Sequence, residues 1–188
     1  MMNITNYPNY NLPKVRNSNL NFQGYERISL NCVDRLISKQ ELNIRKLQKK
    51  HFNAYSTIDK ILIKLNLKKD LSKDMAILDH LGTDPWLYKE KISIRSYGQE
   101  HQMQLAKMGL DESKVLHHVT DIRTCGDFRH SKLKDMVNIE RVGKNLYLNE
   151  SKITDIKNLK MVDRHVYLNE HLSKKDFANV EVCGCILR

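Results

Sequence analysis

Between residues 30 and 81, apolar positions recur every three or four residues, which predicts a series of amphipathic helices. The first is short, near residues 32–37. The second starts at Ser38, which forms a capping box with Glu41. The third covers residues 56–65, where apolar side chains fall at i, i+3, i+4 and i+7: Ile58, Ile61, Leu62 and Leu65. A fourth helix is predicted from a cap at Ser72 to the turn at residues 82–85.

The pattern then changes twice. Residues 83–121 are mixed, with one alternating strand at residues 92–94 and one helix near residues 100–108. From residue 122 the sequence restarts every twenty residues, so that residues 131–139 align with 151–159, and 146–150 align with 166–170. A fixed short period predicts a solenoid whose coils bury their apolar faces against one another.

These patterns predict a mixed α/β protein in four parts. Residues 1–28 are rich in asparagine, lack helical or strand period, and are expected to form a flexible arm. Residues 29–82 form a basic helical domain, 83–121 a connecting segment, and 122–188 a parallel-strand solenoid of about three coils. Val182 to Leu187 would start a further strand with an open edge, through which a second copy could pair.

Charge separates the first part from the rest. The net charge is +10, and residues 1–70 hold 13 Lys/Arg against 5 Asp/Glu, whereas residues 71–121 hold 6 against 8. The helical region is therefore the expected contact for a polyanion. The chain has neither a signal-peptide pattern nor an apolar run long enough to span a bilayer, and its four cysteines are irregularly spaced. We expect a cytoplasmic protein with reduced thiols and no membrane partner.

Residues 44–66 resemble the helix-turn-helix of bacterial and phage DNA-binding proteins, with Ser56-Thr57-Ile58 opening the second helix and Leu47 anchoring the first. The resemblance implies that Ile58 points inward and locks the two helices, while Ser56, Thr57 and Lys60 read the groove. The turn departs from that family, because Phe52 stands where glycine is usual. The nucleic-acid contacts predicted from the charge and the motif are Arg45, Lys46, Lys49, Lys50, Tyr55, Ser56, Thr57, Lys60 and Lys64.

Residues 119–188 resemble leucine-rich repeats, whose LxLxxNxL signature is matched by Leu146 to Ile153 with serine in place of asparagine. Strand alternation directs Leu146 and Leu148 inward and Tyr147 outward, with Ile153, Ile156 and Leu159 closing the coil. The resemblance implies protein binding on the exposed strand face. The predicted contacts there are Arg129, Tyr147, Asn149, Tyr167 and Asn169.

Catalytic and metal-binding patterns are weak by comparison. Cys183, Cys185 and His165 could share one end of the solenoid as zinc ligands, but small buried thiols are the commoner outcome. A metal-dependent nuclease would need His117, His118, Asp127 and His130 to converge, which no spacing dictates. We therefore expect no bound metal, no cofactor, and a binding protein rather than an enzyme.

The sequence thus favours a DNA-binding regulator or adaptor that holds nucleic acid, preferably duplex DNA, through the helices and a protein through the solenoid. Its size and its Asn/Lys richness are typical of phage or mobile-element proteins. An inhibitor of a host defence nuclease, of the anti-CRISPR or anti-restriction type, is the alternative, and a nuclease is the third reading.

Overall fold

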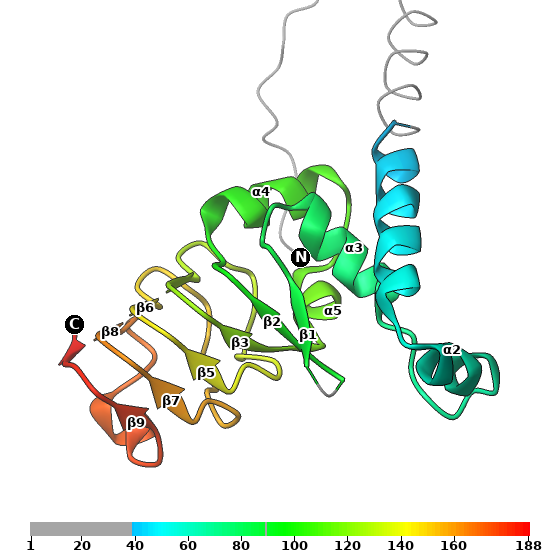
Figure 1. Ribbon diagram of the computed structural model, residues 1–188. Coiled ribbons are helices and arrows are strands. Elements are labelled where there is room, and N and C mark those ends of the chain that lie inside the picture. Colours follow the sequence, from blue (N-terminus) through cyan, green and yellow to red (C-terminus); the bar gives the residue numbers. More distant parts are fainter. Residues whose placement is uncertain (1–38, 89) are drawn as a thin grey trace, which may run out of the picture. The chain divides into compact units, whose positions relative to one another are not determined.

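Helices come first in the described part of the chain, and a parallel-strand solenoid follows them (Figure 1). The computed structural model describes residues 39–88 and 90–188. The predicted arm at residues 1–28, the predicted helix at residues 32–37 and Ser38 of the capping box lie outside these residues.

The helices predicted within the described residues are present, with small shifts at their ends. One helix covers residues 39–54, α2 is Thr57–Lys64, α3 is Ser72–His80 and α4 is Gln99–Lys107. The cap of α3 was predicted one residue late, because Leu71 is the N-cap and Ser72 is the buried first residue of the helix. The structure adds α5 (Glu112–Leu116) and the 3-10 helix η1 (Lys174–Phe177), which the sequence pattern did not reveal.

The strands of the described residues form two sheets that run side by side through the solenoid (Figure 1). The larger sheet has the order β1 (Trp86–Tyr88), β2 (Lys91–Ile94), β3 (Val119–Ile122), β5 (Arg141–Val142), β7 (Met161–Val162) and β9 (Glu181–Val182). The smaller sheet has the order β4 (Gly126–Asp127), β6 (Leu146–Tyr147), β8 (Val166–Tyr167) and β10 (Ile186–Leu187). Apart from the antiparallel pair β1 and β2, neighbouring strands are parallel.

Strand register reproduces the twenty-residue period of the sequence. Arg141 pairs with Met161 in the larger sheet, and Leu146 pairs with Val166 in the smaller one. Each coil therefore contributes one strand to each sheet, and these strands are two residues long except β3, which has four. The fold is mixed α/β with a parallel-strand solenoid of about three turns.

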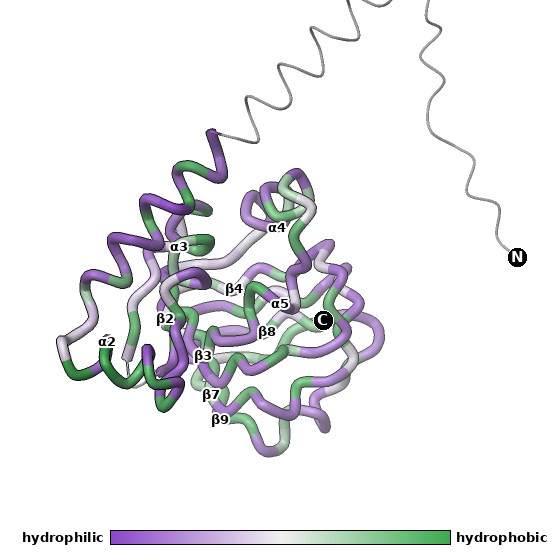
Figure 2. The backbone as a smooth tube through the Cα atoms, turned by 90° about the vertical axis from the view of Figure 1, so that its right-hand side faces the viewer, coloured by the Kyte–Doolittle hydropathy of each residue, from purple (hydrophilic) through white to green (hydrophobic). Residues whose placement is uncertain are grey.

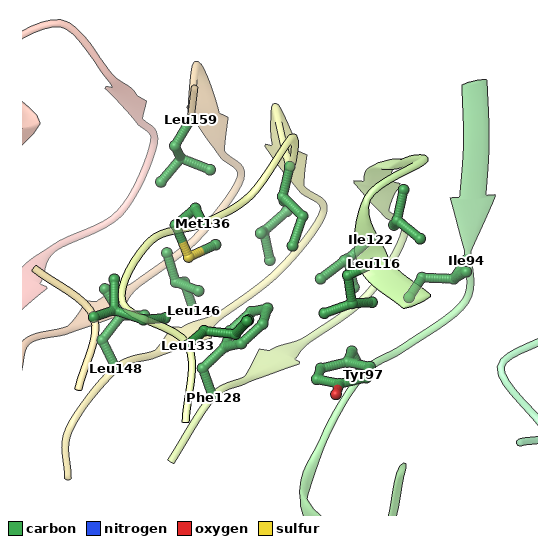
Figure 3. Close-up of a cluster of buried hydrophobic side chains, with 14 of the residues drawn as sticks. Ile94, Tyr97, Leu116, Ile122, Phe128, Leu133, Met136, Leu146, Leu148 and Leu159 are labelled. Carbon is green, nitrogen blue, oxygen red and sulfur yellow. The ribbon is translucent and has the colours of Figure 1, made fainter. Parts of the chain in front are cut away.

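The solenoid interior consists of the apolar positions that repeat. Leu146, Leu148 and Ile153 have no exposed surface, and Ile156 and Leu159 are 5% and 3% exposed, as predicted from the pattern. Figure 3 shows Phe128 of the first coil packed among Leu133, Leu146 and Leu148. Burial of these repeated side chains is the main driving force that holds the coils together.

The segment at residues 83–121 continues the same architecture. Its strand β2 pairs with β3 in parallel, so the larger sheet begins before the repeats become visible in the sequence. Leu105 belongs to the same buried cluster as the solenoid interior, as do Tyr97 and Leu116, which are labelled in Figure 3. The first coil is thus covered by α4 and α5 on the side where the repeat pattern starts (Figure 1).

Candidate functional site

The helix at residues 39–54 has a basic solvent face. Arg45, Lys46 and Lys49 are exposed, whereas Ile44 and Leu47 on the other side are partly buried. Residues 45 and 49, one turn apart, share a face, and Lys46 lies beside them. Within residues 39–88 and 90–188, no carboxylate lies at ion-pair distance from these three cations. Their charge is therefore available to an external anion.

Lys50 differs from these three cations because it is engaged within the protein. Its Nζ lies 3.1 Å from Asp79 Oδ2, and His51 Nε2 lies 3.0 Å from the same oxygen. Asn43 Nδ2 lies 3.0 Å from His80 Nδ1. These contacts join the packed side of the helix to α3. The helix therefore has one side fixed by α3, and its basic side is exposed in the described part of the chain.

The predicted reading helix, α2, uses several of its predicted contacts for its own structure. Ser56 is the N-cap and accepts a hydrogen bond from the backbone N–H of Asp59 at 3.1 Å. Tyr55 accepts one from the N–H of Leu71 at 3.1 Å, and burial raises the pKa of its phenol. Lys60 Nζ donates to the carbonyl oxygen of Asn53 at 3.0 Å. Thr57 and Lys64 remain exposed.

The prediction that Ile58 points inward is wrong. Ile58 is 70% exposed, Ile61 52% and Leu65 61%, and α2 has no buried residue. The reason lies on the opposite side of the helix. Lys68 Nζ donates to Asp59 Oδ1 at 2.8 Å, a hydrogen bond that lowers the pKa of Asp59 and raises that of Lys68, and Lys60 is tied to Asn53. These polar contacts hold the polar side of α2 toward the chain and turn its apolar stripe to solvent.

The smaller sheet presents two stacked tyrosines on its solvent face. The twenty-residue alignment of residues 146–150 with 166–170 predicted that these two side chains are neighbours. The rings of Tyr147 and Tyr167 are 4.7 Å apart between centroids and 11° from parallel. Arg129 lies over the Tyr147 ring, with Cζ 5.5 Å from the centroid. The guanidinium of Arg129 donates two hydrogen bonds to the Asp127 carboxylate, from Nε to Oδ1 at 3.0 Å and from Nη2 to Oδ2 at 2.7 Å. These hydrogen bonds raise the pKa of Arg129. The result is a surface that combines aromatic area with a positive charge, a combination that is common in protein interfaces.

Asn169 is not part of that surface, so its prediction as a contact was wrong. It is 4% exposed, and its Nδ2 donates to the carbonyl oxygens of Ser151 and Ile153 and to Ser151 Oγ. Its Oδ1 accepts from the N–H groups of His171 and Leu172. β8 ends at Tyr167, so Asn169 lies beyond the strand rather than on its outer face. Asn149 is partly buried in the preceding coil, and its Oδ1 is a buried atom without a hydrogen-bond partner in the described part of the chain.

The residues considered for catalysis have separate partners. His118 Nε2 lies 2.7 Å from Lys69 Nζ. The pKa of His118 is lowered mainly by burial and, to a smaller extent, by the positive charge of Lys69. His130 Nδ1 lies 3.4 Å from Glu150 Oε2, and Asp127 holds Arg129. Within residues 39–88 and 90–188, His, Cys, Asp and Glu form no cluster of three or more that could hold a metal ion.

One polar network was missed by sequence reasoning. Glu112 Oε1 accepts hydrogen bonds from Tyr97 Oη at 2.7 Å and from Ser131 Oγ at 3.0 Å, which fastens α5 to the first coil. Burial and the nearby carboxylate raise the pKa of Tyr97. The sequence signal that could have revealed α5 is Asp111, because its side chain caps the helix by accepting a hydrogen bond from the N–H of Ser113.

Comparison of the chain with protein-family models, curated proteins and solved structures found no match. In the described ranges, every helix is too short or too polar to cross a lipid bilayer. The case for a function therefore stands on the two surfaces above: the basic face of the helix at residues 39–54, and the tyrosine face formed by Arg129, Tyr147 and Tyr167.

Proposed function

We propose that this protein is a nucleic-acid-binding adaptor, which holds a polyanion on the basic face and a protein partner on the tyrosine face. The observation that carries the proposal is the set of three exposed cations, Arg45, Lys46 and Lys49, without a carboxylate partner in the described residues. Phosphate groups are the usual partners of such a row, because neutralising them releases condensed counterions.

The helix-turn-helix hypothesis takes a narrower form in this proposal. Ser56 and Lys60 already bond to backbone groups of their own chain, and Tyr55 holds Leu71. The polar groups of α2 that remain exposed are Thr57 and Lys64. We propose that the helix at residues 39–54 supplies most phosphate contacts and that α2 adds these two. Binding of duplex DNA would then depend more on the backbone than on base edges.

The solenoid provides the second half of the proposal. Leucine-rich repeats bind proteins through their strand face, and we propose the same use for the tyrosine face. Tyrosine and arginine are enriched at the energetic centres of protein interfaces, and here each is already fixed by stacking or by a carboxylate. Such fixed side chains lose little conformational entropy on binding.

A salt titration tests the nucleic-acid half. The logarithm of the duplex association constant should fall linearly with the logarithm of salt concentration. Replacing Arg45 and Lys49 together by alanine should flatten this slope by about 2, since each lost phosphate contact removes about 1. The matched control replaces Lys144 and Lys152, two exposed solenoid lysines. A slope unchanged in the first variant, or equally changed in both, would contradict the proposal.

Copurification separates the adaptor from its alternative, an inhibitor of a host defence nuclease. The stacked tyrosines favour a protein contact in both cases. An adaptor binds duplex and partner independently, whereas an inhibitor shows little duplex affinity and copurifies with a protein after nuclease treatment. Loss of the copurified protein from a Tyr147→Ala, Tyr167→Ala variant, with duplex affinity unchanged, is the result expected of the adaptor.

A further inference from the structure

The outward stripe of α2 is an apolar ridge that residues 39–88 and 90–188 leave exposed. Ile58, Ile61 and Leu65, here called the α2 ridge, are each more than half exposed. Figure 2 shows the hydrophobic residues gathered on the segment labelled α2. The spacing i, i+3 and i+7 is that of a helix whose apolar side lies in a groove of another protein. Exposed apolar area of this kind typically marks an interaction site.

Positive charge borders the ridge. Lys64 precedes Leu65 and is exposed, whereas Asp59 is already paired with Lys68 at 2.8 Å. Two ridges facing one another would bring their lysines together, which is unfavourable. The complementary surface should therefore be a hollow that is apolar inside and has more acidic than basic residues around it.

The described chain contains such a hollow on a different set of elements. A cavity of about 760 Å³ lies between α4, α5 and the first coil, here called the α4–α5 groove. Its apolar lining includes Leu105, Leu110 and Leu133, with Met103 49% exposed. Three carboxylates line it, against two lysines: Asp111, Glu112 and Asp135 against Lys132 and Lys134. No residue of α2 lines the groove, so a chain does not fill it with its own ridge.

We propose that the α2 ridge of one copy docks in the α4–α5 groove of a second copy. The two surfaces differ, so the contact is head to tail, and each copy added leaves one ridge and one groove free. Association therefore continues beyond the dimer as concentration rises. A single short helix in one groove forms a contact at the small end of known interfaces, so the dissociation constant should be micromolar or weaker.

The experiment is analytical ultracentrifugation of the full chain over a concentration series, after nuclease treatment and in one buffer. Wild-type protein should show a molar mass that increases with concentration. Ile61→Asp removes the ridge and Met103→Lys fills and charges the groove, and each should weaken association at least about tenfold. Both positions are about half exposed, so circular dichroism should report unchanged folding.

Mixing the two variants gives the sharpest result. Ile61→Asp retains an intact groove, and Met103→Lys retains an intact ridge. An equimolar mixture should therefore form a heterodimer with near wild-type affinity, and growth should stop at the dimer because both remaining surfaces are defective. A mixture that stays monomeric would overturn the proposal, as would a wild-type protein that is monomeric throughout the series.

Two exposed leucines serve as matched controls. Leu42→Asp introduces the same charge on the helix at residues 39–54, and Leu187→Asp introduces it on β10. Both should associate like the wild type. Loss of association in Leu187→Asp with no loss in Ile61→Asp would instead assign the contact to the C-terminal strand edge and overturn the ridge and groove.

Discussion

Asn169 connects two coils with a single side chain. It donates to groups of Ser151 and Ile153 in one coil and accepts from His171 and Leu172 in the next. Because the side chain is buried, its removal leaves several backbone groups without a partner and without water.

Asn169→Ala should lower the free energy of unfolding by about 2 to 4 kcal/mol, since a network of buried hydrogen bonds is lost. Urea unfolding followed by circular dichroism measures the change. Asn149→Ala is the matched control in the neighbouring coil, where the Oδ1 atom has no partner among the described residues, and it should cost less. Equal costs would show that the Asn169 hydrogen bonds contribute little.

Gly143 is required by a close approach between coils. A Cβ atom there would lie 2.3 Å from the carbonyl oxygen of Arg123, in a backbone that is itself held by the sheets. Gly82 is glycine for another reason: its φ is +78° and the space around it is open.

Gly143→Ala should therefore cost more than Gly82→Ala. We expect about 2 to 3 kcal/mol for the steric clash, and about 1 kcal/mol for the left-handed conformation. Thermal and urea unfolding of both variants provide the comparison. A milder effect at Gly143 than at Gly82 would mean that adjacent coils separate easily.

At the scale of elements, Glu140 ties three strands of the larger sheet. It directly precedes β5, and its carboxylate lies 2.9 Å from the Nζ atoms of both Lys91 on β2 and Lys160 before β7. These hydrogen bonds hold the pKa of Glu140 below its ordinary value. A depressed folded-state pKa contributes stability above the unfolded pKa, and this contribution is lost as pH falls through the folded pKa.

Glu140→Gln should consequently destabilise the protein near pH 7 by less than about 1 kcal/mol, because the pairs are largely solvent-exposed. The difference from wild type should shrink as pH falls from the ordinary glutamate range through the depressed pKa of Glu140, where the wild-type carboxylate itself becomes protonated. Unfolding measured across this range is the test. The control is Glu181→Gln, an exposed position without an ion pair in the described residues. A difference that persists in acid would rule out the ion pairs as its cause.

Helix α2 illustrates what periodicity does and does not predict. The spacing of its apolar residues correctly located a helix, and the same spacing was taken to mean that Ile58 is buried. Its direction was decided instead by Asp59 and Lys60, which bond to Lys68 and Asn53. An amphipathic pattern shows that a helix has an apolar side, and tertiary contacts determine whether that side faces the chain or an external partner.

At the scale of the whole molecule, one apolar interior joins α3, the mixed segment and the solenoid, whereas the proposed binding surfaces lie on separate elements. The basic face is on the helix at residues 39–54, and the tyrosine face is on the smaller sheet. Variants that disrupt one surface through exposed side chains should therefore leave the other intact, which is what makes the salt titration and the copurification experiment separable.

The sequence by itself determined the helix at residues 39–54, α2, α3, α4, the twenty-residue coil and its buried positions, because repeated apolar side chains at a fixed spacing have few ways to avoid water. It also located the basic cluster and the pairing of Tyr147 with Tyr167. Tertiary structure alone decided the outward direction of α2, the internal role of Asn169 and the attachment of α5 through Glu112. Each of these three features depends on hydrogen bonds or ion pairs, formed between residues distant in the chain or just outside the repeating pattern. Whether such a bond forms depends on the distance and angle between its groups, and the period of the sequence does not encode these.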